Sequence, residues 1–201
     1  VVRELTSSDG DGPPRPSDES MEAIRDAEAY FGFGIPRLLF LEGRRLRWVH
    51  SAAAGGGKAL YPEMLESEVL LSNSAGIHAV PIAEYVVAGI LHFFRGLDVA
   101  AYQQHERHWD KRFFVAEDSP VREMADAHIL IVGAGGIGTE CAKRLNALGA
   151  RCVGIRRHPE RGVPEGFERV AGPDQLDAEL QRTDVVVLAA PLTKESSGLL
   201  D

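Results

Sequence analysis

The clearest hydrophobic pattern lies in the second half of the chain, where short apolar runs alternate with helical segments. Residues 128–132 are continuously apolar, which is typical of a strand buried on both faces. The pattern after this run predicts a helix, a strand, a second helix and a third strand, at residues 136–148, 151–155, 174–181 and 184–190. This βαβαβ order predicts a parallel sheet with helices packed against it.

The first half of the chain has weaker patterns of the same kind. Chain-breaking residues predict a loop at 6–20, and Ser20 stands where it would cap a helix over residues 21–29. The remaining expected elements are a strand at 29–33, a helix at 36–43, a strand at 46–50, a small-residue loop at 51–57 and an apolar run at 68–71. Strands that alternate with helices again predict a parallel sheet.

A long apolar helix is predicted between these two halves. Over residues 81–97 the apolar positions recur at helical spacing and cover most of the helix surface, so we expect burial on several sides. The polar stretch at 102–117 is predicted to be a surface crossing. We therefore expect two domains, one at 1–98, which includes this interdomain helix, and one at 99–201.

Length and composition restrict the class of protein. The 201 residues are 44% hydrophobic and carry a net charge of −8, which favours a packed core and predicts no nucleic-acid partner. The sequence shows no apolar run of membrane-spanning length and no secretory leader, so we expect no membrane partner. Cys141 and Cys152 lack metal-ligand spacing and are too few for a disulfide framework, so we expect a cytoplasmic protein without a metal site.

The motif with the most chemical content is Gly133-Ala134-Gly135-Gly136-Ile137-Gly138, which fits G-x-G-x-x-G and directly follows the apolar strand. In a dinucleotide site, Gly133 permits the tight turn, Gly135 lets the backbone approach a pyrophosphate, and Gly138 lets the helix lie close to the strand. The phosphates then bind free N–H groups at the helix N-terminus. This glycine loop (residues 133–138) therefore predicts dinucleotide binding, and a glycine-rich structural turn is the alternative.

Arg156 and Arg157 stand at the end of the next strand, about 20 residues after the glycines, where NAD-binding domains place a carboxylate for the ribose hydroxyls. A guanidinium instead pairs with a 2′-phosphate. The two arginines therefore favour NADP as the cofactor. NAD is the alternative if these arginines only face solvent.

Several motifs occur in a specific order along the chain. They are Asn73-Ser74-Ala75-Gly76-Ile77-His78 leading into Ile82-Ala83-Glu84, the glycine loop, and Ala190-Pro191-Leu192-Thr193-Lys194-Glu195 followed by Gly198-Leu199. In this order they resemble the D-isomer-specific 2-hydroxyacid dehydrogenases, and most closely the branch of glyoxylate/hydroxypyruvate reductases. The resemblance implies a Rossmann-type doubly wound parallel sheet, incomplete in this chain, preceded by a smaller flavodoxin-like α/β substrate domain.

The resemblance also implies a substrate site. Ala53, Ala54, Gly55 and Gly56 match the family's loop whose backbone N–H groups hold the substrate carboxylate. Small residues suit this role, because they can present consecutive N–H groups to an anion. A flexible glycine-rich turn is the alternative reading of this small-residue loop.

Further cofactor contacts follow from the same resemblance. Gly136 and Ile137 match the pair that contacts the pyrophosphate. Ala190, Pro191 and Thr193 match the strand end and loop beside the two riboses of the cofactor. These residues all follow strands of the predicted parallel sheet, where ligands bind in such folds.

In this family, hydride passes between a nicotinamide and the carbon that bears the hydroxyl or oxo group, and a His, a Glu or Asp, and an Arg assist. These three residues lie downstream of the segment around Pro191, and the chain ends at Asp201. We therefore expect a truncated NAD(P)-dependent reductase of small 2-oxoacids such as glyoxylate or hydroxypyruvate, with no catalytic residue within the chain and no activity alone. A non-catalytic dinucleotide-binding module is the alternative. Full-length relatives are dimers, so a homodimer is expected for the complete protein.

Overall fold

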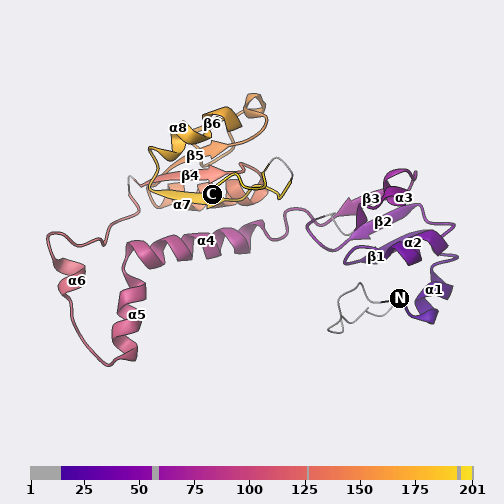
Figure 1. The fold of residues 1–201 in the computed structure, drawn as a ribbon, viewed down its shortest axis with the longest axis horizontal. Coiled ribbons are helices and arrows are strands. Elements are labelled where there is room, and N and C mark those ends of the chain that lie inside the picture. The colour runs from indigo at the N-terminus through magenta and orange to yellow at the C-terminus, as the bar shows by residue number, and fades with distance from the viewer. Residues whose placement is uncertain (1–14, 56–58, 126, 194–195, 201) are drawn as a thin grey trace. The chain divides into compact units, whose positions relative to one another are not determined.

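The computed structural model describes residues 15–55, 59–125, 127–193 and 196–200. The chain forms two compact units, Val1–Ile77 and His78–Asp201 (Figure 1). Each unit contains one sheet, and all the strand pairs in both sheets are parallel. The predicted α/β class with parallel sheets is thereby confirmed. Most of the loop predicted at 6–20 lies outside the described residues.

The first unit is a parallel sheet in the order β1-β2-β3 with short helices against one face. Its elements are α1 (Asp18–Ala23), β1 (Ala29–Gly32), α2 (Arg37–Glu42), β2 (Trp48–Ser51), α3 (Pro62–Leu65) and β3 (Leu70–Asn73). Val49 is fully buried at the centre of the sheet, between Tyr30 and Leu71 in the strand register. Leu39 of α2 and Met64 of α3 pack into the same cluster, so the helices cover this face.

The opposite face of this sheet is open in the described part of the first unit. Side chains alternate along a strand, so Phe31, Trp48 and Leu70 lie on the face away from the helices. Their exposed fractions are 73%, 46% and 65%. This open face also carries His50 and Ser72, which are half-buried.

The first helix differs from its prediction. It begins earlier than residue 21 and ends at Ala23, because Ser17 rather than Ser20 is the N-cap. The Ser17 hydroxyl accepts from the Ser20 N–H at 3.2 Å, and the Ser20 side chain is buried beneath it. The sequence pattern did not separate two serines that are both suited to capping.

The second unit contains a parallel sheet in the order β6-β5-β4-β7. Its strands are β4 (His128–Val132), β5 (Arg151–Ile155), β6 (Arg169–Ala171) and β7 (Val185–Leu188). Its helices are α4 (Ala79–Phe94), α5 (Leu97–His105), α6 (Arg112–Val115), α7 (Gly136–Ala147), α8 (Leu176–Leu180) and the 3-10 turns η2 (Pro159–Arg161) and η3 (Pro173–Gln175). The predicted bounds of β4 and β5 are confirmed.

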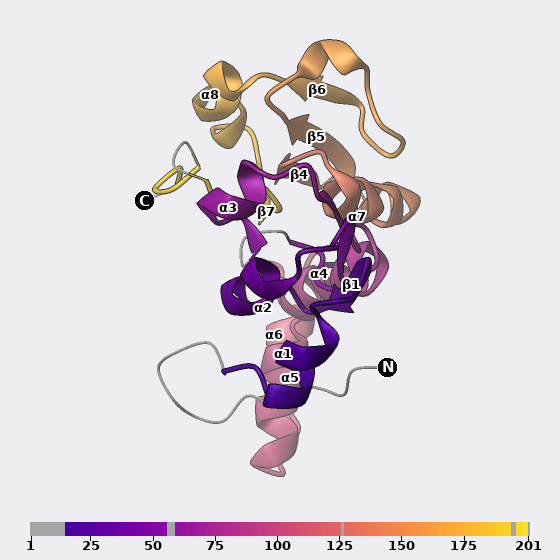
Figure 2. The ribbon, with the colours of Figure 1, turned by 90° about the vertical axis from the view of Figure 1, so that its right-hand side faces the viewer.

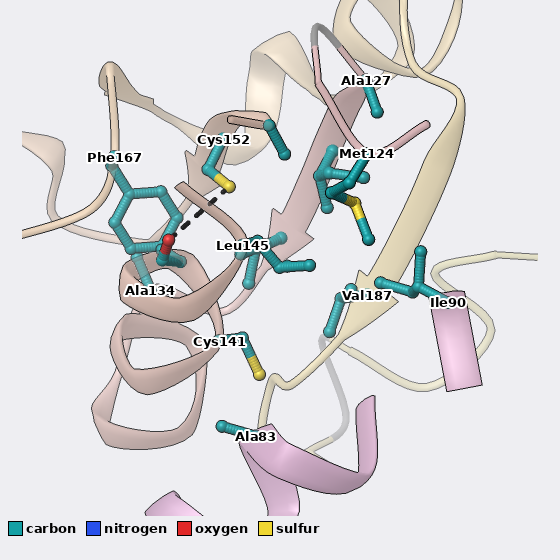
Figure 3. Packing of buried hydrophobic residues seen from close by; sticks show 14 residues of the cluster. Ala83, Ile90, Met124, Ala127, Ala134, Cys141, Leu145, Cys152, Phe167 and Val187 are labelled. Atoms are coloured by element: carbon teal, nitrogen blue, oxygen red, sulfur yellow. Dashed lines mark hydrogen bonds between the residues drawn. The ribbon is translucent and has the colours of Figure 1, made fainter. Parts of the chain in front are cut away.

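The central strand β4 is buried on both faces, as its continuous apolar run predicts. Ile129 and Ile131 pack toward α7 and α4, in a cluster that also holds Leu145 (Figure 3). Leu130 and Val132 pack on the other face with residues of α8. Figure 2 shows α7 and α8 on opposite sides of this sheet, which is the doubly wound arrangement of a Rossmann-type domain.

The long helix α4 is buried on one face only within this chain, so the expectation of burial on several sides is wrong for the described residues. Ala83 and Ile90 pack on the core beside α7, whereas Tyr85 is 81% and Phe93 is 69% exposed. By its contacts α4 belongs to the second unit. The boundary between the units along the chain therefore lies after Ile77, earlier than the boundary predicted between residues 98 and 99. The assignment of this helix to a domain of the complete protein stays a prediction.

Several segments were not predicted as helix or strand, among them α3 in the first unit. The crossing at 102–117 contains the end of α5 and all of α6, and these helices have no buried residue and so show no amphipathic pattern. The edge strand β6 is only three residues long. It forms because Arg156 N donates to Ala171 O at 3.0 Å and Glu168 N to Cys152 O at 2.9 Å.

One helix pair in the second unit has a notable composition. Among the described residues no single helix is long and apolar enough to span a membrane. The pair α4 and α5, which is bent by 72°, has that length and composition only when the two helices are taken together.

Candidate functional site

The glycine loop lies where β4 ends and α7 begins, and two of its glycines are required by close packing. Gly133 has a φ of 107°, and a Cβ there would lie 2.6 Å from the backbone N of Ala190. A Cβ on Gly138 would lie 2.1 Å from the carbonyl oxygen of Gly133. These contacts agree with the predicted roles of Gly133 in the turn and of Gly138 in bringing helix and strand together.

The other two glycines face open space. A Cβ on Gly135 or Gly136 would meet no described atom within 4 Å. Gly135 is the N-cap of α7, and its carbonyl accepts the first helical bond, from Thr139 N at 2.8 Å. The N–H groups of Gly136, Ile137 and Gly138 donate to no other described residue. Open space in front of free N–H groups at a helix N-terminus fits a pyrophosphate.

The predicted cofactor residues come together at the carboxyl ends of three adjacent strands. Gly133 N donates to Ile155 O at 2.8 Å, which ties the glycine loop to the end of β5. The close approach of Gly133 to Ala190 ties it to the end of β7. Arg156 directly follows β5. This sheet edge is where ligands bind in open parallel sheets.

Arg156 is half-buried at this edge and forms no ion pair with a described residue. Its Nη1 donates to the carbonyl oxygen of Gly162 at 3.4 Å, so most of its donors remain available to an anion. Arg157, the next residue, is exposed. A guanidinium at this position, in place of a carboxylate, is a group that can pair with a phosphate.

Ser196 contacts two of the predicted cofactor residues after β7, although the sequence pattern did not indicate it. Its hydroxyl donates to Pro191 O at 2.7 Å and accepts from Thr193 N at 2.7 Å. Thr193 Oγ1 accepts in return from Ser196 N at 3.3 Å. These bonds hold Pro191 and Thr193 close to Ser196, after the end of β7.

The small-residue loop lies in the first unit, after β2, and the turn at residues 73–75 holds it. The Ala53 carbonyl accepts from Ser74 N at 3.2 Å, and the Ala54 carbonyl accepts from Asn73 Nδ2 at 2.9 Å. Asn73 Oδ1 also accepts from Ala75 N at 3.3 Å. Of the predicted substrate residues, Ala53, Ala54 and Gly55 are described, and Gly56 lies outside the described residues.

This arrangement fixes the direction of two amide groups. In a trans peptide the C=O and the following N–H point to opposite sides, and the described peptide bonds are all trans. Because the carbonyls of Ala53 and Ala54 point to the 73–75 turn, the N–H groups of Ala54 and Gly55 point away from it. Neither N–H donates to a described residue. Two consecutive N–H groups that have no partner among the described residues are the arrangement that an anion-binding backbone nest needs.

The sequence pattern did not reveal which residues support this loop. In the sequence, Asn73 and Ser74 belong to a recognisable motif, but the pattern does not indicate that they hold Ala53 and Ala54. Ser51 is 2% exposed, and its hydroxyl accepts from Ala53 N at 3.3 Å. A polar residue at the end of a strand, followed by small residues, is the signal that would have pointed to Ser51.

The described residues hold no cluster of three or more His, Cys, Asp or Glu that would bind a metal. Both cysteines are buried in the core, Cys141 on α7 and Cys152 on β5 (Figure 3). Burial raises the pKa of Cys141, and it raises the pKa of Cys152 to about 12. The Cys152 thiol donates to Ala142 O at 3.9 Å, so these thiols have packing roles.

The doubly wound sheet and the glycine loop between β4 and α7 define a dinucleotide-binding domain of the Rossmann type. Residues 87–201, more than half of the chain, match the family described as D-isomer specific 2-hydroxyacid dehydrogenase, NAD binding domain. The chain belongs to this family, as the order of its motifs predicts.

Individual relatives agree with this assignment. Glyoxylate/hydroxypyruvate reductase A of Citrobacter koseri is 30% identical over 175 residues, which cover 83% of this chain and 52% of that protein. A D-isomer specific 2-hydroxyacid dehydrogenase family protein from Aeromonas salmonicida subsp. salmonicida has a crystal structure similar to this one, with a TM-score of 0.75 at 26% identity. One from Klebsiella pneumoniae has a TM-score of 0.71 at 29% identity. Both structural matches cover 89% of this chain and 55% of the other. The chain spans about half the length of the curated relatives it matches.

Proposed function

We propose that this chain supplies the cofactor loop and the carboxylate loop of an NAD(P)-dependent reductase of small 2-oxoacids such as glyoxylate or hydroxypyruvate, which acts in reverse on D-2-hydroxy acids. The observation that supports the proposal is that two loops of one chain have backbone N–H groups without a partner among the described residues. The glycine loop has free N–H groups at a helix N-terminus, and the small-residue loop has free N–H groups at Ala54 and Gly55. The name of the Citrobacter koseri relative supports the choice of substrates.

Each residue has a limited task in this proposal. The N–H groups of Ala54 and Gly55 bind the substrate carboxylate, and those of Gly136 and Ile137 bind the pyrophosphate. Ala190, Pro191 and Thr193 lie against the riboses. The bound nicotinamide supplies or accepts the hydride. The proposal assigns no proton donor to a residue of this chain.

We further propose that NADPH is the preferred cofactor, because Arg156 offers a guanidinium where a 2′-phosphate would lie. The test is a fluorescence titration of the chain with NADH and with NADPH, repeated with Arg156→Asp. We expect tighter binding of NADPH and reversal of that preference in the variant. Arg151→Asp is the matched control, since Arg151 is an exposed arginine at the other end of β5 and its replacement changes the net charge equally.

Turnover separates the reductase from a non-catalytic dinucleotide-binding module. Oxidation of NADPH or NADH by the complete protein with glyoxylate or hydroxypyruvate is the expected result. Tight cofactor binding without turnover of any 2-oxoacid would support the module instead. Equal affinity for both cofactors, unchanged in Arg156→Asp, would refute the assignment of the 2′-phosphate to Arg156.

We also propose that the complete protein is a homodimer in which α4 takes part. Ile82, Tyr85 and Phe93 of α4 are exposed, unlike its buried residues Ala83 and Ile90, and their exposed fractions are 39%, 81% and 69%. An exposed apolar stripe of this kind favours a protein contact. Sedimentation of the complete protein tests this, with Tyr85→Lys expected to shift dimer toward monomer.

A further inference from the structure

His50 lies on the open face of the first sheet, and both of its ring nitrogens have a serine partner. Nδ1 is 2.8 Å from Ser72 Oγ, and Nε2 is 3.2 Å from Ser74 Oγ. The ring stacks on Phe31, with 5.4 Å between ring centroids and 7° between planes. The imidazole is therefore held in one plane between two hydroxyl groups of β3 and the turn after it.

The neighbouring groups decide which ring nitrogen carries the proton. The Trp48 indole N–H can only donate, and it donates to Ser72 Oγ at 2.9 Å. The Ser74 hydroxyl donates to the carbonyl oxygen of Ser51 at 3.3 Å. Since its one hydrogen is used there, Ser74 Oγ accepts from His50 Nε2–H. Nδ1 of the neutral ring is then an acceptor and receives the Ser72 hydroxyl hydrogen.

These bonds form one chain that ends at the small-residue loop. Ser74 contacts the loop with its N–H, which donates to Ser51 O at 3.0 Å and to Ala53 O at 3.2 Å, and with its hydroxyl. The direction of the Ala54 N–H depends on the bond between Ser74 and Ala53. A side chain that fixes Ser74 therefore fixes one of the two donors proposed to bind the carboxylate.

We propose that His50 is a positioning residue for the small-residue loop: as the neutral Nε2–H tautomer it donates to Ser74 and thereby holds the Ala54 N–H group in place for a carboxylate. This role rests on the proposed function, because it presumes that the loop binds a carboxylate. His50 does not itself contact the substrate. The sequence alone did not indicate it, since strand pairing brings Ser72 and Ser74 beside it from more than 20 residues away.

The tautomer is tested directly on the 201-residue chain with ¹⁵N-labelled histidine. Long-range ¹H–¹⁵N spectra of the imidazoles distinguish Nδ1–H from Nε2–H, and His50→Gln identifies the signals by their loss. We expect the Nε2–H form for His50 when the ring is neutral. A neutral ring with the proton on Nδ1 would overturn the proposed direction of the hydrogen bonds.

Three substitutions separate the hydrogen bond from the bulk of the ring. His50→Phe keeps a ring against Phe31 but cannot donate to Ser74. His50→Asn places its amide too close to the backbone to reach Ser74, whereas His50→Gln carries an amide donor near the position of Nε2. Leu70→Ala is the matched control, because Leu70 lies on the same open face, is 65% exposed and has an apolar side chain that forms no hydrogen bond.

Two NMR measurements follow the effect of each variant. The first is hydrogen exchange of the Ala53 and Ser74 amides, and the second is the shift of the Ala54 and Gly55 amide signals on titration with oxalate. Loss of one hydrogen bond predicts about fivefold faster exchange and about fivefold weaker oxalate binding in His50→Phe and His50→Asn. His50→Gln and Leu70→Ala are expected to stay within about twofold of the unsubstituted chain.

The two proposals fail in different ways. If oxalate does not shift the Ala54 and Gly55 signals in the unsubstituted chain, the carboxylate site of the proposed function is wrong, and the exchange rates still test whether His50 holds the loop. If His50→Phe matches the unsubstituted chain in both measurements, His50 has no positioning role. Equal losses in His50→Gln and His50→Phe would likewise refute it, since the ring alone would then matter.

Discussion

Gly133 and Ala190 lie so close together that a Cβ on Gly133 would be 2.6 Å from the Ala190 backbone N. This approach brings the end of β4 against the end of β7, and the 107° φ of Gly133 turns the chain into α7 at the same point. The turn therefore positions two groups of proposed cofactor residues at once. A side chain here would disturb both the packing of the sheet edge and the site.

Gly133→Ala is expected to lower the free energy of unfolding of the second unit by about 2 kcal/mol or more, because the left-handed backbone is unfavourable for alanine and the backbone of β7 cannot move aside freely. Urea unfolding followed by far-UV circular dichroism measures this. Gly89→Ala in α4 is the control, since a Cβ there meets no atom within 4 Å and alanine favours helix. Equal stability of the two variants would contradict the close packing.

Gly135→Ala should separate folding from cofactor binding. The φ of Gly135 is −92°, and a Cβ there meets no described atom, so we expect a loss of stability of no more than about 1 kcal/mol, from the weaker N-cap. The same Cβ occupies the space in front of the helix N-terminus and should weaken NADH and NADPH binding at least tenfold, about 1.4 kcal/mol. Fluorescence titration measures the affinity. Unchanged binding of both cofactors would place the pyrophosphate elsewhere.

The sequence predicted the glycine loop well because one local pattern decides each of its parts. The apolar run of β4 indicates a strand without knowledge of its neighbouring strands, and the glycines follow it directly in the sequence. The supports of the small-residue loop were not predictable in this way. Asn73 and Ser74 reach that loop only because β3 pairs in parallel with β2, and no local pattern indicates this register. Ser17 was missed for a different reason, since capping depends on backbone angles that composition does not specify.

Cys141 and Cys152 are expected to resist alkylation in the folded chain. Both side chains are fully buried, and burial raises the pKa of Cys152 to about 12, so little thiolate forms at pH 8. Intact-mass analysis after treatment with iodoacetamide should show no modification without denaturant and two modifications in urea. Ser197→Cys provides an exposed thiol as the positive control. Rapid modification of either native cysteine in the folded chain would show that the core beneath α7 opens readily.

Asp184 joins three segments of the second unit, and its charge should make stability depend on pH. Its carboxylate accepts from Arg122 at 2.9 and 3.0 Å and from His128 N at 2.8 Å, while the Arg122 guanidinium lies 4.4 Å from the centroid of the Phe94 ring. The hydrogen bond from Arg122, with that from the His128 backbone, holds the pKa of Asp184 below its ordinary value of 3.8. The folded state therefore favours the ionised carboxylate.

This lowered pKa contributes stability that is fully present above about pH 4 and is lost as the pH falls through the folded-state pKa. Asp184→Asn should cost about 1–2 kcal/mol at neutral pH, because it weakens hydrogen bonds to a charged group. The difference between the two proteins should shrink as the pH falls from 4 to about 2. Urea unfolding at each pH measures it, and Asp177→Asn on the exposed side of α8 is expected to change stability by less than about 0.5 kcal/mol. A constant difference across this range would show that the Asp184 charge does not contribute.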